Sequence, residues 1–123
     1  MKTERRAVAR YQAKLDVQIE IDGYCFDAVS MEVSLRGLRI VCEGIHANKI
    51  FSQYLQVTPG ENITAGIEIK TPRQHDLTDT LKCHTRVISV NRISQRSYVV
   101  GFNIIEFDDE GLESWKAYIT KRH

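Results

Sequence analysis

Apolar and polar residues alternate along several stretches of this chain, with the period of two that is typical of a β-strand with one buried face. The clearest stretch runs from Leu15 to Ile21, where the odd positions are apolar and the even positions are Asp, Gln or Glu. Asp22-Gly23 follows directly, and Asp-Gly is a preferred turn of two-residue β-hairpins. The pattern therefore predicts that the first regular element is an antiparallel hairpin.

Similar runs separated by turn residues predict the remaining strands. The return strand of the hairpin starts at Tyr24 and runs towards Val33, and Ser34-Leu35-Arg36-Gly37 forms the next turn. Alternating or apolar runs predict four more strands, near residues 38–42, 63–69, 81–87 and 98–107. Val87-Ile88 breaks the alternation of its strand, which indicates a β-bulge or a covered outer face.

The run 98–107 is apolar on both faces, so both faces must be covered. The segment 108–122 predicts this cover, as a helix with Leu112, Trp115 and Ile119 on one face. One face of the 98–107 strand would then fill a core, and the helix would lie over the other.

Two further expectations concern helices. Asp108 or Asp109 suits the N-cap of the C-terminal helix, where a side-chain oxygen accepts a backbone N–H. Between Ile45 and Leu55 the apolar residues have helical spacing, which predicts one or two helical turns.

Together these elements predict a single, mainly β domain of 123 residues. Its short strands and short connections favour a small six-stranded antiparallel β-barrel, because closure removes exposed strand edges. The C-terminal α-helix packs on this barrel. We divide the chain into a basic arm at 1–12, the barrel at 13–107 and the helix at 108–122.

Composition and charge exclude several classes of protein. The hydrophobic fraction of 42% and the charged fraction of 27% are those of an ordinary globular domain. The net charge of +1 gives no overall field that would attract a nucleic acid polymer or a membrane surface. No stretch approaches the roughly 20 apolar residues of a membrane span, and Met1 is followed by charged residues instead of a signal peptide. We expect a cytoplasmic protein without a membrane span.

No cluster of residues indicates catalysis or a metal site. Cys25, Cys42 and Cys83 are odd in number and lack a C-x-x-C spacing, so we expect buried, reduced thiols. The four histidines include no i, i+4 pair, and no nucleophile motif or phosphate-binding glycine loop is present. We therefore expect no enzymatic activity, no metal and no cofactor.

The arm carries Arg5, Arg6 and Arg10 within six residues. In a solvated terminus such a cluster is an ordinary surface feature. Arginine, however, has a planar fork of donors that matches guanine O6 and N7 or phosphate oxygens, and its plane stacks on bases. The cluster therefore also suits a compact dinucleotide that contains guanine.

Two motifs, in this order and ahead of these strands, resemble the PilZ domain family. The R-x-x-x-R motif of the family is present in a fuller form as Arg5-Arg6-x-x-x-Arg10, and its D/N-x-S-x-x-G motif reads Glu32-Val33-Ser34-Leu35-Arg36-Gly37. Leu38-Arg39-Ile40, the Pro59-Gly60 turn and the strand from Tyr98 to Phe107 also look like the family. The resemblance extends over nearly the whole chain.

This resemblance implies a receptor for the bacterial second messenger cyclic di-GMP. Arg6 and Arg10 would bind guanine edges and phosphates, and Arg5 would add a contact and admit a second, stacked nucleotide. Ser34 would hydrogen-bond a phosphate, and Gly37 would let the backbone approach the ligand. Binding would draw the arm over the barrel and so signal to an unidentified protein partner in motility, pilus or exopolysaccharide machinery.

Glu32 departs from the family pattern, which has Asp or Asn at the position that accepts guanine N1–H and N2–H. Glutamate keeps the acceptor but adds one methylene, so its carboxylate lies further out. Two other hypotheses stay open. One is a protein-interaction adaptor with a degenerate site, which Glu32 favours. The other is a barrel that binds single-stranded nucleic acid, although the pattern assigns most aromatic residues to the core and not to stacking platforms.

Overall fold

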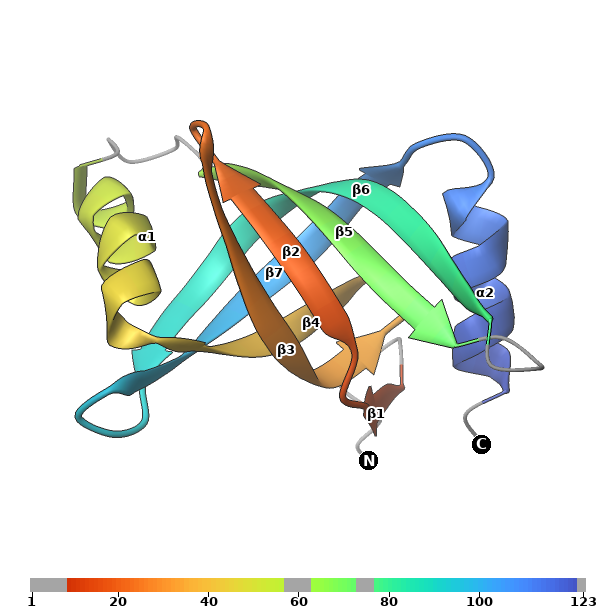
Figure 1. Ribbon diagram of the computed structural model, residues 1–123, viewed down its shortest axis with the longest axis horizontal. Helices are drawn as coiled ribbons and strands as arrows, with labels where there is room; N and C mark the ends of the chain where they lie inside the picture. Colours follow the sequence, from red (N-terminus) through yellow and green to blue (C-terminus); the bar gives the residue numbers. More distant parts are fainter. Residues whose placement is uncertain (1–8, 57–62, 73–76, 122–123) are drawn as a thin grey trace, which may run out of the picture.

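The computed structural model describes residues 9–56, 63–72 and 77–121 (Figure 1). Within these ranges the chain forms seven β-strands and two α-helices. In chain order they are β1 (Arg10–Gln12), β2 (Asp16–Ile21), β3 (Tyr24–Ser34), β4 (Gly37–Glu43), α1 (Gly44–Gln56), β5 (Thr64–Pro72), β6 (Thr78–Arg92), β7 (Ser97–Phe107) and α2 (Gly111–Thr120).

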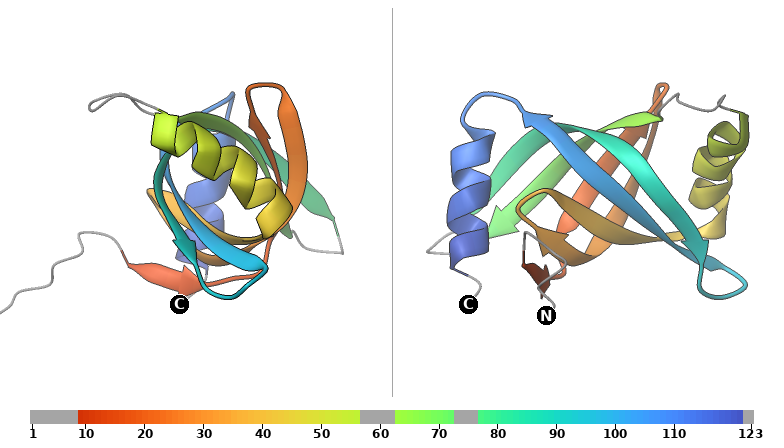
Figure 2. Two further views of the ribbon diagram at one scale, coloured as in Figure 1. Left: turned by 90° about the vertical axis from the view of Figure 1, so that its left-hand side faces the viewer. Right: turned by 180° about the vertical axis from the view of Figure 1, so that it is seen from behind.

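Six of these strands form a closed antiparallel barrel. The strands follow the order β3-β2-β5-β6-β7-β4, and pairing between β3 and β4 completes the ring. Helices α1 and α2 lie at opposite ends of this barrel (Figures 1 and 2). The predicted all-β class, the six-stranded barrel and the C-terminal helix are confirmed. The short strand β1 lies outside the ring and pairs with β3.

The predicted first hairpin is confirmed in its register and its turn. Val17, Ile19 and Ile21 point into the core and are at most 3% exposed. Asp22 and Gly23 have φ angles of 51° and 82°, so both central residues of the turn have the positive φ that a type I′ turn requires. The apolar face of β2 and the chemistry of its turn therefore agree.

A buried serine fixes the chain where the arm meets the barrel. The Ser30 side chain, in a residue only 2% exposed, donates a hydrogen bond to the Ala13 carbonyl at 2.6 Å. The same hydroxyl oxygen accepts a hydrogen bond from the Leu15 backbone N–H at 2.8 Å. Ser30 thereby satisfies two backbone groups that no barrel strand pairs, and it ties the start of the barrel to β3.

The bulge that Val87-Ile88 indicates is present in β6. The register between β6 and β7 shifts between Val87 and Ser89. Val87 stays in the core at 5% exposure, whereas Ile88 is turned outward and is 51% exposed. The bulge therefore changes which side of the strand faces solvent just beside β7.

The outer face of β7 is covered only in part. Phe107, at the end of the strand, packs against Trp115 of α2 with ring centroids 6.0 Å apart. Val99 is also buried, at 7% exposure, but Ile105 is 53% exposed. The expectation that the C-terminal helix covers the second apolar face is thus confirmed at Phe107 and wrong at Ile105, because α2 lies across one end of the barrel and not along the strand.

The face of α2 that meets the barrel differs from the predicted one. Gly111, Trp115 and Ile119 are its buried residues, and Leu112 is 43% exposed. Gly111 packs so closely on β7 that a Cβ at this position would lie 3.0 Å from the Phe107 ring. This contact turns Leu112 towards solvent and gives the buried face an i, i+4, i+8 spacing.

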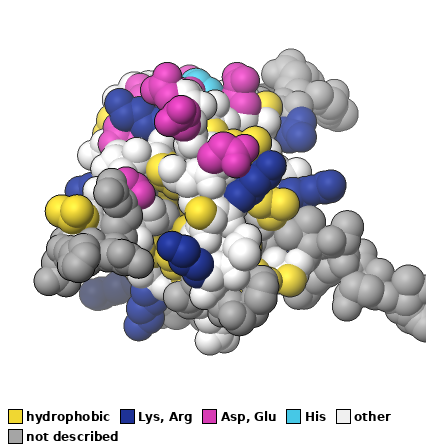
Figure 3. All heavy atoms as spheres, turned by 90° about the vertical axis from the view of Figure 1, so that its right-hand side faces the viewer, with side chains coloured by type: hydrophobic (Ala, Val, Ile, Leu, Met, Phe, Trp, Pro, Cys, Tyr) yellow, Lys and Arg dark blue, Asp and Glu magenta, His cyan; other side chains and the backbone are white. Residues whose placement is uncertain are grey.

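The predicted N-cap is also wrong. The cap residue is Glu110, which makes no side-chain capping hydrogen bond. The Asp108 carboxylate instead lies 3.2 Å from His84 Nε2, and Asp109 adopts a φ of 52°. On the side of the molecule that carries α2, acidic side chains gather near the N-terminal end of the helix, beside a histidine (Figure 3). The local acidic charge therefore suits the positive end of the helix without serving as its cap.

The predicted helix between Ile45 and Leu55 is confirmed and is longer than one or two turns, since α1 contains 13 residues. Ala47 and Ile50 of α1 are fully buried. The His46 ring stacks on Phe26 at 4.6 Å and its Nδ1 lies 2.8 Å from the Tyr24 hydroxyl. Within the described ranges neither helix has the length and apolar character that crossing a membrane requires. The Pro59-Gly60 turn lies outside the described residues.

Two of the three cysteines are buried as expected, and Cys25 is exposed instead. Burial raises the pKa of the Cys42 thiol to about 11 and that of the Cys83 thiol to about 12, with smaller contributions from Glu43 and Asp108. Thiolate is the reactive form, so both buried groups stay protonated at pH 8.

We therefore expect iodoacetamide at pH 8 to label Cys25 alone in the folded protein, with peptide mass spectrometry as the measurement. In guanidinium chloride all three thiols should react, which serves as the control. Labelling of Cys42 or Cys83 at the rate of Cys25 in the folded protein would contradict their burial.

Candidate functional site

The end of the arm forms a strand that lies beside the second motif. The sequence placed Arg10 in a basic arm or loop, but Arg10–Gln12 forms β1 and pairs antiparallel with β3. In this register Arg10 lies opposite Ser34, and Gln12 lies opposite Glu32. Backbone pairing therefore brings the last arginine of the first motif next to the acidic residue and the hydroxyl of the second.

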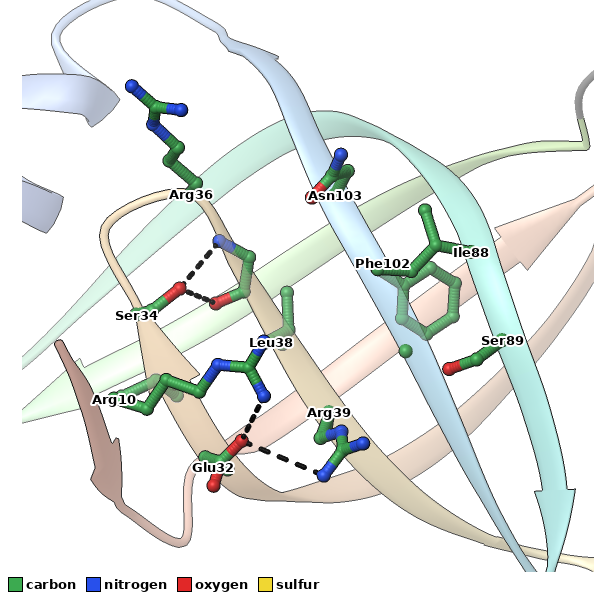
Figure 4. A pocket seen from close by; sticks show the side chains of 13 residues that line it. Arg10, Glu32, Ser34, Arg36, Leu38, Arg39, Ile88, Ser89, Phe102 and Asn103 are labelled. Atoms are coloured by element: carbon green, nitrogen blue, oxygen red, sulfur yellow. Dashed lines mark hydrogen bonds and ion pairs between the residues drawn. The ribbon is translucent and has the colours of Figure 1, made fainter. Parts of the chain in front are cut away.

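A pocket of about 340 Å³ opens on the outer surface of the barrel, next to β1 (Figure 4). The lining comes from β1, β3, β4, β6, β7 and the turn between β3 and β4. Its polar residues include Arg10, Glu32, Arg36, Arg39, Ser89 and Asn103. The charged residues described around the pocket are three arginines and one glutamate, which leaves a net charge of +2. The pocket therefore suits an anion.

Glu32 is the meeting point of two of these arginines. Its Oε1 lies 3.4 Å from Arg10 Nη1 and 3.8 Å from Arg39 Nη1 (Figure 4). The side chain of Glu32 is 26% exposed, and those of Arg10 and Arg39 are 38% and 43% exposed. Ion pairs that are this long and this exposed contribute little to stability, so the arginines remain available to a ligand.

The turn between β3 and β4 is held by hydrogen bonds from several sides. The Ser34 hydroxyl oxygen accepts a hydrogen bond from the Gly37 N–H at 3.1 Å and lies 3.4 Å from the Gly37 carbonyl, to which it donates. The Ile104 N–H donates to the Arg36 carbonyl at 2.8 Å. The indole N–H of Trp115 donates to the Ser34 carbonyl at 3.0 Å. Strand β7 and helix α2 thus both hold the backbone of the site.

Gly37 has a reason for its small size within the barrel itself. It lies opposite Asn103 in the pairing of β4 with β7. A Cβ at this position would collide with the carbonyl oxygen of Phe102. The close approach of β4 to β7 therefore excludes any side chain here, in addition to the ligand contact that the resemblance implies.

Four of the residues expected in the site are brought together by the fold. Arg10, Glu32, Ser34 and Gly37 all line the pocket, and Arg5 and Arg6 lie outside the described residues. The sequence assigned no role to four other lining residues, which are Arg36, Arg39, Ser89 and Asn103. The parity of the strands held a signal for Arg39, because residues that alternate with the buried Leu38 and Ile40 face outward on the same strand.

No family model matches the sequence, and no curated protein is significantly similar to it. Solved structures are similar at low identity. The Bacillus subtilis inhibitor of motility MotI/DgrA superposes with a TM-score of 0.72 at 17% identity, over 98% of this chain and 51% of that chain. The PilZ domain of Escherichia coli YcgR, solved with cyclic di-GMP, has a TM-score of 0.64 at 15% identity, over 97% of this chain and 92% of that chain.

Borreliella burgdorferi PlzA, solved in complex with cyclic di-GMP, has a TM-score of 0.61 at 10% identity, over 91% of this chain and 50% of that chain. This chain therefore spans about half the length of MotI/DgrA and of PlzA. The chain has the fold of PilZ domains.

Proposed function

We propose that this chain is a non-catalytic receptor for cyclic di-GMP. The observation that carries the proposal is the pairing of β1 with β3, which places Arg10 beside Ser34 at a pocket with a net charge of +2. Cyclic di-GMP combines two guanines with two phosphodiesters, and arginine forks match both groups. Two structures similar to this chain, those of YcgR and PlzA, are solved with this ligand.

In this proposal Arg10 binds a guanine edge or a phosphate from the end of the arm. Arg5 and Arg6 add contacts of the same kind, and Arg5 admits a second, stacked nucleotide. Ser34 binds a phosphate through its hydroxyl group, whose hydrogen bonds to described residues stay within its own turn, at 3.1 and 3.4 Å. The turn is fixed before ligand arrives, so little ordering of this part of the site is required on binding.

In this proposal the arm carries the signal from the bound ligand to a partner protein. Ligand bound by Arg5, Arg6 and Arg10 draws the part of the arm that precedes β1 against the barrel, and the surface formed there is read by a partner protein. The partner belongs to motility, pilus or exopolysaccharide machinery. No enzymatic step and no cofactor are part of this function.

We expect the wild-type protein to bind cyclic di-GMP with a saturable, micromolar or tighter affinity in calorimetry, and GTP to bind far more weakly. Arg10→Ala should weaken the affinity roughly tenfold or more, because it removes an arginine fork from the ligand. Arg6→Ala should have a similar effect.

Arg96→Ala is the matched control, since it removes one arginine from the exposed turn between β6 and β7 and should leave the affinity unchanged. Equal binding by Arg10→Ala and wild type would place the ligand elsewhere. Absence of binding by the wild type would favour the adaptor with a degenerate site.

A further inference from the structure

Arg39 lies between the Glu32 carboxylate and an open part of the pocket surface. In the pairing of β3 with β4 it lies opposite Glu32, and in the pairing of β4 with β7 it lies opposite Gly101. Gly101 in turn lies opposite Ser89 of β6. Arg39 thus has the Glu32 carboxylate on one side. On its other side lie Gly101, which has no side chain, and then Ser89, which has a small one.

Gly101 and Ser89 pack closely, so no large side chain projects from this part of the pocket surface. A Cβ added at Gly101 would lie 2.5 Å from the Ser89 hydroxyl oxygen, so a side chain at this position would displace that hydroxyl group. Both residues line the pocket together with Arg39. A ligand placed there meets the Arg39 guanidinium from the side away from Glu32.

Glu32 is a weak counter-ion, because two arginines share one of its carboxylate oxygens. One oxygen, Oε1, serves both Arg10 at 3.4 Å and Arg39 at 3.8 Å, and both distances exceed the 2.7–2.9 Å of a strong charge-assisted hydrogen bond. A phosphodiester that approaches these two arginines offers full-strength contacts in their place. Arg10 comes from β1 and Arg39 from β4, so one anion between them would bridge the arm and the barrel.

We propose that Arg39 is a further ligand-binding residue and that Glu32 is an internal anion that competes with a ligand phosphate for Arg39 and Arg10. The proposal rests on the proposed function and names the phosphodiester of a cyclic dinucleotide as the group that Arg39 binds. It assigns Glu32 a role opposite to the acceptor of guanine N–H groups that the resemblance implies. In the free protein Glu32 holds the two arginines at the pocket, and the bound ligand releases it.

The two roles of Glu32 predict opposite signs for one substitution. Glu32→Gln removes the competing charge and keeps a similar shape. If Glu32 competes with phosphate, this variant binds cyclic di-GMP several-fold more tightly than wild type. If Glu32 accepts guanine N–H groups, the loss of its charge weakens binding instead, because a neutral amide is a poorer acceptor than a carboxylate.

The experiment is calorimetry of the full chain with cyclic di-GMP, for wild type, Glu32→Gln, Arg39→Ala, Arg39→Lys and the double variant Glu32→Gln/Arg39→Ala. We expect Arg39→Ala to weaken binding about tenfold and Arg39→Lys to restore part of the loss, since lysine keeps the charge without the fork. The gain from Glu32→Gln should shrink in the Arg39→Ala background, because the two residues are coupled. Arg96→Ala again controls for net charge, and circular dichroism checks the fold of each variant.

The outcomes separate this inference from the proposed function. Binding by wild type that Arg39→Ala leaves unchanged, or that Glu32→Gln weakens, would overturn the inference and leave the receptor function in place. No binding by wild type but clear binding by Glu32→Gln would support it strongly. No binding by either protein would overturn both.

Discussion

Trp115→Ala is expected to lower the free energy of unfolding by about 3–5 kcal/mol, the usual cost of removing a large aromatic side chain from a core. Trp115 is fully buried, and its ring centroid lies 6.0 Å from that of Phe107 and 5.8 Å from that of Tyr118. It also ties α2 to the turn between β3 and β4, through the hydrogen bond to the Ser34 carbonyl at 3.0 Å. The substitution should therefore weaken both the docking of the helix and the rigidity of the site.

A second substitution at this position separates the two effects. Trp115→Phe keeps an aromatic ring but removes the partly buried hydrogen bond to the Ser34 carbonyl, and the net contribution of such a bond is about 0.5–1.5 kcal/mol. Denaturant unfolding of both variants is followed by circular dichroism. Tryptophan fluorescence is unsuitable, because Trp115 is the single tryptophan of the chain and both substitutions remove it. Leu112→Ala, on the exposed side of the same helix, is the control and should change stability little. Equal stability of Trp115→Ala and Leu112→Ala would contradict the packing described for α2.

Gly37→Ala is expected to lower the free energy of unfolding by about 3 kcal/mol, at the upper end of the usual cost of overpacking. The added methyl group would collide with the Phe102 carbonyl oxygen, so β4 and β7 would have to move apart at the turn that carries Ser34. Affinity for cyclic di-GMP should fall in the same variant, because the two strands form one wall of the pocket.

Gly66→Ala provides a matched comparison within the same barrel. Gly66 is a strand residue of β5, and a Cβ there would meet no atom within 4 Å. We expect this variant to unfold at the same denaturant concentration as wild type or slightly higher, since alanine restricts the unfolded chain more than glycine does. A Gly37→Ala protein as stable as Gly66→Ala would show that β4 and β7 can separate without cost.

Much of this fold could be predicted because single strands carry their own signals. The alternation from Leu15 to Ile21 records which side faces the core, and Asp22-Gly23 records the turn, so neither depends on distant residues. Closure of the barrel was predicted only as the general remedy for exposed edges. The pairing of β2 with β5 and of β4 with β7 joins residues far apart in sequence, and no local pattern contains it.

The face of α2 could not be predicted for a related reason. Leu112 suited the apolar stripe of an isolated helix, but the close contact of Gly111 with Phe107 sets which face meets the barrel. Likewise, Asp108 is a good capping residue in isolation, but His84 of the neighbouring strand lies 3.2 Å from its carboxylate. Tertiary contacts thus override local preferences at the end of the chain.

At the candidate site, the two motifs that resemble the PilZ family contain four predicted site residues that the fold brings to one pocket, and their role in binding stays a prediction. They could not give the register of β1 against β3, which sets Arg10 beside Ser34. They also could not indicate Arg39, because the role that we propose for it depends on Gly101 of the adjacent strand β7 and on Ser89 of the next strand, β6. Residues that act through what lies next to them in space are those that a linear motif omits.

The anchoring of the chain by Ser30 limits how far a motion of the arm can travel. The barrel ring is complete without β1, and the hydrogen bonds of Ser30 to Ala13 and Leu15 mark the boundary between the two. Opening the three-residue ladder of β1 is therefore a sub-global event, whose free energy lies far below that of unfolding the barrel. In the function that we propose, the arm then attaches and detaches many times during the life of one folded barrel, so the receptor resets without unfolding.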